Sequence, residues 1–295
     1  MRFDSYHPMI NLIYFAGAIV CAVTFNHPVF LAITYLASFC YSVKLNGKRS
    51  LLFNLVLIPL IFMYAFYYSG YHHFGITVLK KNFIGNQMTL EALVTGYVRG
   101  TAAASVLMIC GCIFAVFSSD KVVYLFGRIS PKLSLFLSIL LRFVPRVKKR
   151  AAGIETARRG AGKGCTQGNL FRRAAHVVSL LSVLVTWTAE DFVESAASMK
   201  SRGYSLKGRT SFSIYRFDNR DRCVVLLFAA CLTVTGAAVL FQQTTILYSP
   251  EIVWNRITPF SFFFYAVYAF FLFLPMLLQM AGESKYRMAV RKNID

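Results

Sequence analysis

The chain has 295 residues, of which 57% are hydrophobic and only 15% are charged, and its formal net charge is +20. This composition excludes an ordinary soluble domain and predicts an all-α integral membrane protein. The positive charge does not indicate a nucleic-acid partner, because the cations lie where membrane topology explains them and no exposed aromatic residues are interleaved with them.

Residues 1–117 are predicted to form an amino-terminal membrane domain of four spans. A short "NHP" stretch at 26–28 separates the first two spans, and Pro59 is expected to kink the third, since membrane helices tolerate proline. The spans are expected at about 11–25, 27–43, 51–69 and 89–117.

Residues 118–222 are predicted to form a basic cytoplasmic region with two long helices at the inner membrane surface, each apolar on one side and cationic on the other. The first helix is expected to start at Pro131, to be interrupted at Pro145 and to end within 160–164. The second is expected over 174–204. Both are predicted to terminate in the same manner, with an arginine in the last turn followed by a glycine.

Residues 223–295 are predicted to hold two more spans, at about 223–243 and 258–280, and a basic cytoplasmic tail. With the amino terminus inside, 28 of the 32 Lys and Arg residues face the cytoplasm. This bias predicts six spans with both termini cytoplasmic, in the plasma or inner cell membrane. The basic middle region is also expected to attract anionic membrane lipids, by roughly 1 kcal/mol per cation near the leaflet.

No catalytic residue, metal site or cofactor site is predicted from the sequence. The stretch "GAGKGCT" at 160–166 lacks the spacing of a phosphate loop, and no HExxH pattern occurs. The acids Glu190, Asp191 and Glu194 are explained by helix solvation and by pairing with Lys200 or Arg202 on the same helix. The chain is therefore not expected to be an enzyme.

Two other classes stay open at this point. A self-contained permease or channel would need a polar path, and four side chains would have to converge to form it: Asn54, Gln87, Thr95 and Thr101. A membrane enzyme acting on lipid would need Glu190, Asp191 and His176 to gather around one pocket at the inner interface.

Four segments in this order carry a family resemblance: "YHPMINLIYF" at 6–15, "LRFVPRV" at 141–147, "RRG" at 158–160 and "SRG" at 201–203. With them, the chain resembles the transmembrane T component of energy-coupling factor transporters, the CbiQ/EcfT family. Two departures stand out. Arg158 occupies a position where that family often has alanine, and "MIN" follows the His-Pro pair where the family has a sequence of the "RTK" type.

The resemblance implies a non-catalytic coupling subunit of a bacterial ATP-driven importer for vitamins or transition metals such as cobalt. In that family two motifs end helices that cross and dock into grooves of two ABC-type ATPase subunits, which bind the ATP and magnesium; no cofactor is implied for this chain. The matching ATPase-coupling residues are Arg159, Arg202, Gly160, Gly203, Arg158 and Ser201.

The apolar parts of the two long helices are then expected to carry the substrate-binding membrane subunit, the S subunit. Their attraction is non-directional, which would let that subunit slide. The expected contact residues are Leu137, Leu140, Leu141, Val144, Leu180 and Leu184.

Overall fold

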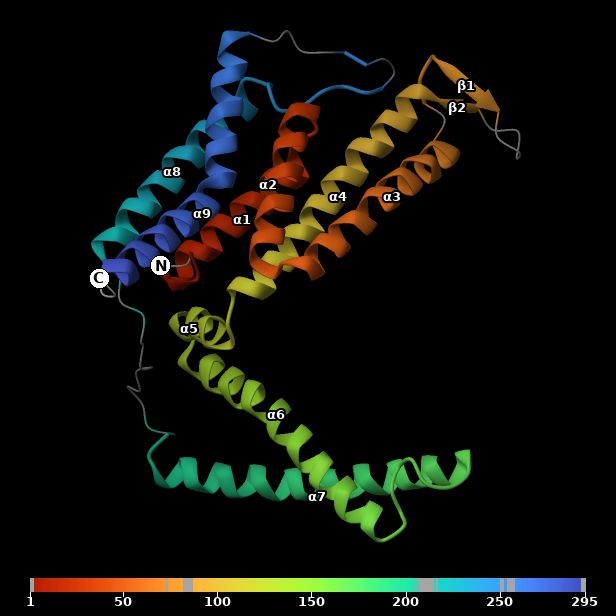
Figure 1. Cartoon of the computed structure of the whole chain (residues 1–295), viewed down its shortest axis with the longest axis vertical. Coiled ribbons are helices and arrows are strands. Elements are labelled where there is room, and N and C mark those ends of the chain that lie inside the picture. The colour runs from red at the N-terminus through yellow and green to blue at the C-terminus, as the bar shows by residue number, and fades with distance from the viewer. Residues whose placement is uncertain are drawn as a thin grey trace. The chain divides into compact units, whose positions relative to one another are not determined.

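The computed structural model describes residues 3–72, 74–81, 87–204, 206, 215, 217–249, 252–253 and 258–292. The chain divides into two compact units (Figure 1). The membrane unit comprises Met1–Ser118 and Tyr215–Asp295, and the middle unit comprises Ser119–Ile214. These bounds lie close to the predicted domain limits at 118 and 222.

The membrane unit is almost entirely helical where it is described, as the composition predicts. One short antiparallel hairpin, which the sequence did not indicate, connects two of its long helices. Its elements are η1 (Phe3–Ser5), α1 (Pro8–Thr24), α2 (Pro28–Asn46), α3 (Lys48–Tyr71), β1 (Val78–Lys81), β2 (Gln87–Thr89), α4 (Leu90–Val116), α8 (Asn219–Leu240) and α9 (Pro259–Lys292).

Helices α1 and α2 begin with the same device, a histidine cap followed by proline. The ring nitrogen of His7 accepts a hydrogen bond from the Met9 amide at 3.3 Å, and that of His27 accepts one from the Val29 amide at 3.2 Å. Proline suits the first helical position because the missing N–H would have no intrahelical partner there. The His-Pro pair of the "NHP" stretch therefore starts α2, whereas α1 ends before the stretch, at Thr24 with Phe25 as its cap.

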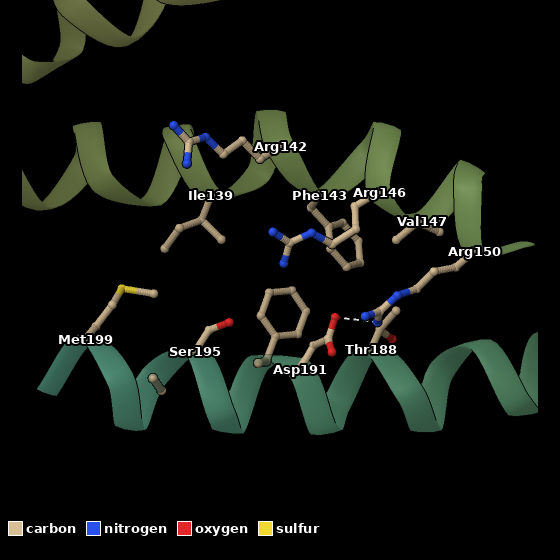
Figure 2. A pocket seen from close by; sticks show the side chains of 12 residues that line it. Ile139, Arg142, Phe143, Arg146, Val147, Arg150, Thr188, Asp191, Ser195 and Met199 are labelled. Atoms are coloured by element: carbon tan, nitrogen blue, oxygen red, sulfur yellow. Dashed lines mark ion pairs between the residues drawn. The ribbon is translucent and has the colours of Figure 1, made fainter. Parts of the chain in front are cut away.

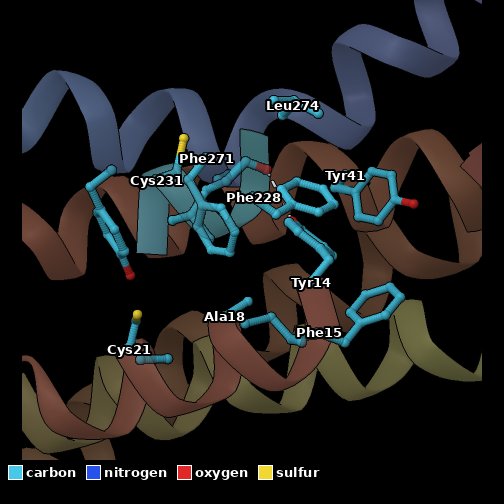
Figure 3. Close-up of a cluster of buried hydrophobic side chains, with 14 of the residues drawn as sticks. Tyr14, Phe15, Ala18, Cys21, Tyr41, Phe228, Cys231, Phe271 and Leu274 are labelled. Carbon is cyan, nitrogen blue, oxygen red and sulfur yellow. Dashed lines mark hydrogen bonds between the residues drawn. The ribbon is translucent and has the colours of Figure 1, made fainter. Parts of the chain in front are cut away.

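The core of the membrane unit lies among α1, α2, α4, α8 and α9 and is rich in aromatic rings (Figure 3). The Tyr14 hydroxyl of α1 donates to the Leu272 carbonyl of α9 at 3.0 Å, and Thr34 of α2 shares a 2.7 Å hydrogen bond with Tyr268 of α9. Such bonds have no competing water in a bilayer interior, so they help to fix the helix register. The start of α1 and the end of α9 lie at the same end of this unit (Figure 1).

Six helices of the described chain are long and apolar enough to cross a membrane: α2, α3, α4, α7 (Leu170–Ser201), α8 and the Pro259–Ser284 part of α9. The number equals the predicted six spans, but the membership differs. At 17 residues α1 is shorter, about 25 Å against a hydrocarbon core of about 30 Å, although it packs in the core. Helix α7 qualifies by length and composition, whereas the sequence predicted it at the membrane surface.

In its described residues, the middle unit contains three helices: α5 (Ser119–Ile129), α6 (Pro131–Gly160) and α7. Helix α6 runs over the predicted range, but it is continuous through Pro145, so the expected interruption is wrong. A single proline removes only one backbone hydrogen bond, and the rest of the helix spans the gap. Helix α5 packs on α6, where the Ser134 hydroxyl donates to the Val123 carbonyl at 3.3 Å.

Candidate functional site

Helices α6 and α7 cross one another with antiparallel direction (Figures 1 and 2). Three contacts give the register. Phe143 of α6 stacks on Phe192 of α7 with ring centroids 5.0 Å apart, Arg150 pairs with Asp191, and Arg158 donates to the Ser179 hydroxyl at 2.8 Å. As the residue number rises along α6 it falls along α7, so the carboxyl-terminal ends of the two helices point away from each other.

The ion pair between Arg150 and Asp191 holds the crossing together. The Arg150 guanidinium also donates to the Trp187 carbonyl at 3.4 Å. The hydrogen bond from Arg150, together with its charge and that of Arg146, holds the pKa of Asp191 below its usual value. Asp191 therefore pairs with the other helix, and the prediction that it pairs within its own helix is wrong. The intrahelical prediction was based only on residue spacing along α7, and that spacing does not show that α6 places Arg150 beside Asp191.

Helix α6 ends in a Schellman motif built around Gly162, whose φ is +75°. The Gly162 amide donates to the Arg159 carbonyl at 3.1 Å, and the Lys163 amide donates to the Arg158 carbonyl at 2.9 Å. The end falls within the predicted range 160–164, but the residue in the left-handed conformation is Gly162. Gly160 is still helical.

Helix α7 ends in the same motif built around Gly203, whose φ is +76°. The Gly203 amide donates to the Lys200 carbonyl at 3.1 Å, and the Tyr204 amide donates to the Met199 carbonyl at 3.2 Å. The prediction that the two helices terminate alike holds for the backbone. It fails for the side chains, because Arg202 is the capping residue of α7 whereas Ala161 has that place in α6. Relative to the capping residue, the Arg159–Gly160 pair therefore lies two positions earlier in α6 than the Arg202–Gly203 pair does in α7.

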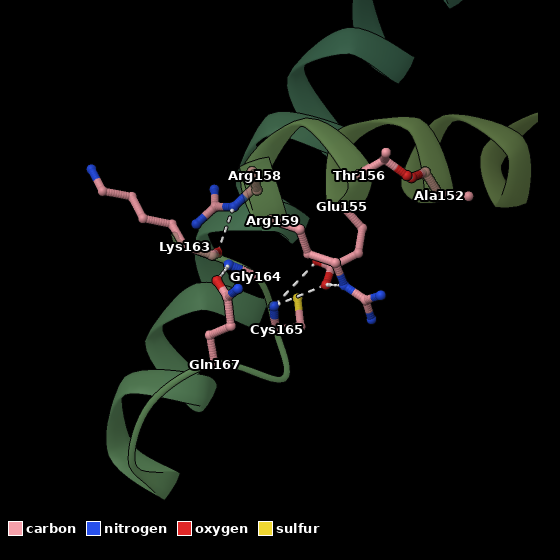
Figure 4. A network of polar contacts seen from close by, with 9 residues as sticks. All are labelled: Ala152, Glu155, Thr156, Arg158, Arg159, Lys163, Gly164, Cys165 and Gln167. Atoms are coloured by element: carbon pink, nitrogen blue, oxygen red, sulfur yellow. Dashed lines mark hydrogen bonds and ion pairs between the residues drawn. The ribbon is translucent and has the colours of Figure 1, made fainter. Parts of the chain in front are cut away.

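The side chains at the end of α6 are tied together by Glu155 (Figure 4). Its carboxylate accepts hydrogen bonds from the Cys165 amide at 3.0 and 3.2 Å and from Arg159 Nε at 3.0 Å. Hydrogen bonds from Cys165, and then from Arg159, hold the pKa of Glu155 below its usual value. The loop after α6 is thus anchored to the helix, while the Arg159 side chain is still 56% exposed.

The other predicted coupling residues differ in how firmly they are held. Arg158 reaches α7 through Ser179, and its Nε donates to the Lys163 carbonyl at 3.4 Å. The Ser201 hydroxyl donates to the Ser198 carbonyl at 2.9 Å. Arg202 is exposed, and its side chain makes no hydrogen bond or ion pair with the part of the chain that the structure describes. Arg159 and Arg202 are therefore the more available of the predicted arginines.

The apolar residues expected to contact an S subunit lie on both helices. Leu140, Leu141 and Val144 of α6 are exposed, and Leu137 and Leu180 are half-buried. Leu184 is only 9% exposed, so it contributes more to the middle unit's interior than to its open surface.

Within the described residues, neither alternative site is assembled. Close approaches of Gly96 to Ala65 and of Gly100 to Ile61 set α3 antiparallel to α4. In that register Asn54 lies about 10 Å along the axis from Thr101 and about 20 Å from Thr95. Both threonine hydroxyls bond to carbonyls of their own helix, and the Gln87 side chain lies outside the described residues. The polar path therefore does not converge.

The three residues that a membrane enzyme acting on lipid would need, Glu190, Asp191 and His176, do not gather around one pocket either. His176 precedes Asp191 by fifteen residues on α7, which is about 22 Å. Asp191 is engaged by Arg150. Within the described residues, no group of three or more His, Cys, Asp and Glu side chains is placed to hold a metal ion.

No family model matches the chain. It is similar to curated proteins named "Energy-coupling factor transporter transmembrane protein EcfT". The protein from Lacticaseibacillus paracasei is 33% identical over 112 residues, which is 38% of this chain and 41% of that protein. The one from Lactococcus lactis is 31% identical over 115 residues, 39% and 42% of the two chains. The one from Lactobacillus helveticus is 28% identical over 112 residues, 38% and 39%.

The chain spans about two fifths of the length of these curated relatives. Over that length, the similarity supports the resemblance to T components of energy-coupling factor transporters that the short motifs indicated. Together with six span-capable helices, it supports a multi-pass membrane protein.

Proposed function

We propose that this chain is the transmembrane coupling subunit of an ATP-driven importer of the energy-coupling factor type. In this role it links two cytoplasmic ABC-type ATPase subunits to a substrate-binding membrane subunit that takes up a vitamin or a transition metal. The observation that supports this most directly is the antiparallel crossing of α6 and α7. It gives the α6–α7 pair two capped, cationic ends that face in opposite directions.

The separation of the ends suits two partners. Gly160 and Ser201 each lie ten residues beyond the Arg150–Asp191 pair, so each end extends about 15 Å past the crossing. The ends are then up to about 30 Å apart, too far for one groove. Each would enter a groove of a separate ATPase subunit, with ATP and magnesium bound by the ATPases and no cofactor bound by this chain.

Arg159 and Arg202 are the proposed docking groups. An arginine fork can make paired hydrogen bonds to a carboxylate, and truncating one partner of such a buried pair costs about 2 to 5 kcal/mol. Arg159 would have to exchange or share its bond to Glu155, whereas the exposed Arg202 has no such bond within the described residues. The end of α7 is therefore expected to contribute more to the affinity.

The exposed apolar stripe of Leu140, Leu141 and Val144 is the proposed seat of the substrate-binding subunit. The orientation proposed is both termini cytoplasmic. It is supported by the cation bias and by the shared location of the start of α1 and the end of α9.

Retention of the ATPases tests the proposal. The tagged chain is co-expressed with the ATPases of its host and purified in mild detergent, with Arg159→Ala, Arg202→Ala and the double variant compared with wild type. The matched control is Lys163→Ala, which removes an exposed cation from the loop beside Arg159. We expect the double variant to lose the ATPases and the control to keep them. Equal loss in the control, or no ATPase with the wild type, would refute docking through these arginines.

A further inference from the structure

A pocket of about 440 Å³ lies between the middle of α6 and the carboxyl-terminal half of α7 (Figure 2). Its walls are mostly apolar, and the stacked rings of Phe143 and Phe192 lie in its middle. Ile139 and Met199 line one end, and the Arg150–Asp191 ion pair lines the other. The pocket is thus a short channel with an apolar end and a charged end.

The charges around this pocket do not balance. Arg142, Arg146 and Arg150 follow one another at four-residue spacing on the α6 side, whereas Asp191 is the single acid in the lining. Asp191 is committed to Arg150. Arg142 and Arg146 are exposed, and no hydrogen bond or ion pair to either is found within the described chain. Their Cβ atoms are about 6 Å apart at this spacing, so both guanidinium groups can reach one anion.

This face differs from the proposed seat of the substrate-binding subunit. By helical periodicity, the pocket residues of α6 are centred roughly 140° around the helix from the centre of the stripe of Leu140, Leu141 and Val144. A second occupant is therefore sterically compatible with that subunit. Two adjacent arginines suit phosphate, whose oxygens match the guanidinium fork, and the apolar walls suit hydrocarbon.

We propose that the pocket binds one anionic phospholipid of the cytoplasmic leaflet. Its phosphate would lie between Arg142 and Arg146, and one acyl chain would run past Phe143 and Phe192 toward Ile139 and Met199. The lipid would contact both α6 and α7 and stabilise their packing. It would do so on the far side of the Arg150–Asp191 pair from the Arg158–Ser179 contact. The proposal does not rest on ATPase docking, since it requires only that the middle unit meets the inner leaflet.

Lipid titration of the full-length chain tests this site. The chain, purified in neutral detergent, is titrated with dioleoyl phosphatidylglycerol or with dioleoyl phosphatidylcholine, and bound lipid is counted by native mass spectrometry. We expect one tightly bound phosphatidylglycerol and much weaker phosphatidylcholine. The variant Arg142→Gln/Arg146→Gln should bind phosphatidylglycerol about 30-fold more weakly, from the loss of two cations near the headgroup.

Two further variants make the result specific. Lys148→Gln/Lys149→Gln removes the same charge from exposed positions of α6 that do not line the pocket, and it should leave the tight site intact. Ser195→Phe keeps every cation and fills the pocket from the α7 side, where Ser195 points toward α6 (Figure 2), and it should displace the lipid. Equal losses in the two charge variants, unchanged binding in Ser195→Phe, or equal binding of the two lipids would each overturn the proposal.

Discussion

Replacing Gly162 by alanine should loosen the end of α6, whereas replacing Gly160 by alanine should tighten it. Gly162 has a φ of +75°, where a Cβ atom costs about 1 to 2 kcal/mol. The reduced freedom of the unfolded chain returns about 0.4 to 1 kcal/mol, so the net loss is about 1 kcal/mol. Gly160 is helical, and a Cβ there meets no atom within 4 Å. Alanine should therefore gain about 0.8 to 1 kcal/mol of helix propensity at position 160.

Hydrogen exchange measured by mass spectrometry on a peptide covering 156–168 reads this difference directly. The amides of residues 162 and 163 donate to the Arg159 and Arg158 carbonyls, so their exchange reports opening of the helix end. We expect exchange about five times faster with Gly162→Ala and slower with Gly160→Ala. If Gly160→Ala loosened the end as much as Gly162→Ala, then Gly160 would be the terminating residue and the register offset between the two helix ends would be wrong.

Two other predictions concern the crossing and the membrane core. Because Arg150 lowers the pKa of Asp191, their contact is present above the ordinary carboxyl pKa of about 3.9 and is lost as the pH falls through the lowered value. Trp187 fluorescence, with the second tryptophan replaced by phenylalanine, should change only in that acid range, and Asp191→Asn should abolish the change; a transition near pH 6 would contradict this. Thr34→Val leaves the buried Tyr268 hydroxyl without its 2.7 Å partner and should cost about 0.6 to 2 kcal/mol in detergent unfolding, whereas Thr34→Ser should be near neutral.

The long helices of the middle unit could be predicted because their signals are local. Pro131 marks the first helical position of α6, and cations and glycines mark its end. The same kind of signal was present for α5 and was missed: Val122, Phe126 and Ile129 repeat at helical spacing. The signal is short, and it was overlooked because polar and charged residues flank it and a long predicted span precedes it.

The details of the site could not be predicted because they depend on contacts between distant residues. Three glycines fall within 160–164, and residue spacing alone does not say which one adopts positive φ. The Arg150–Asp191 pair and the Phe143–Phe192 stack join residues more than forty positions apart. Their pairing follows from the loop that turns α6 back onto α7, which sequence periodicity does not describe.

The position of the Arg150–Asp191 pair along α6 gives the crossing a mechanical advantage. Pro131 lies nineteen residues before Arg150 and Gly160 ten residues after it, so the helix forms a lever with arms of about 29 and 15 Å. If the pair acts as the pivot, a displacement of the Gly160 end is roughly doubled at the Pro131 end. Pro145 lies within the longer arm and removes one backbone hydrogen bond there. The stiffness of that single turn would then set how much of the amplified motion reaches α5.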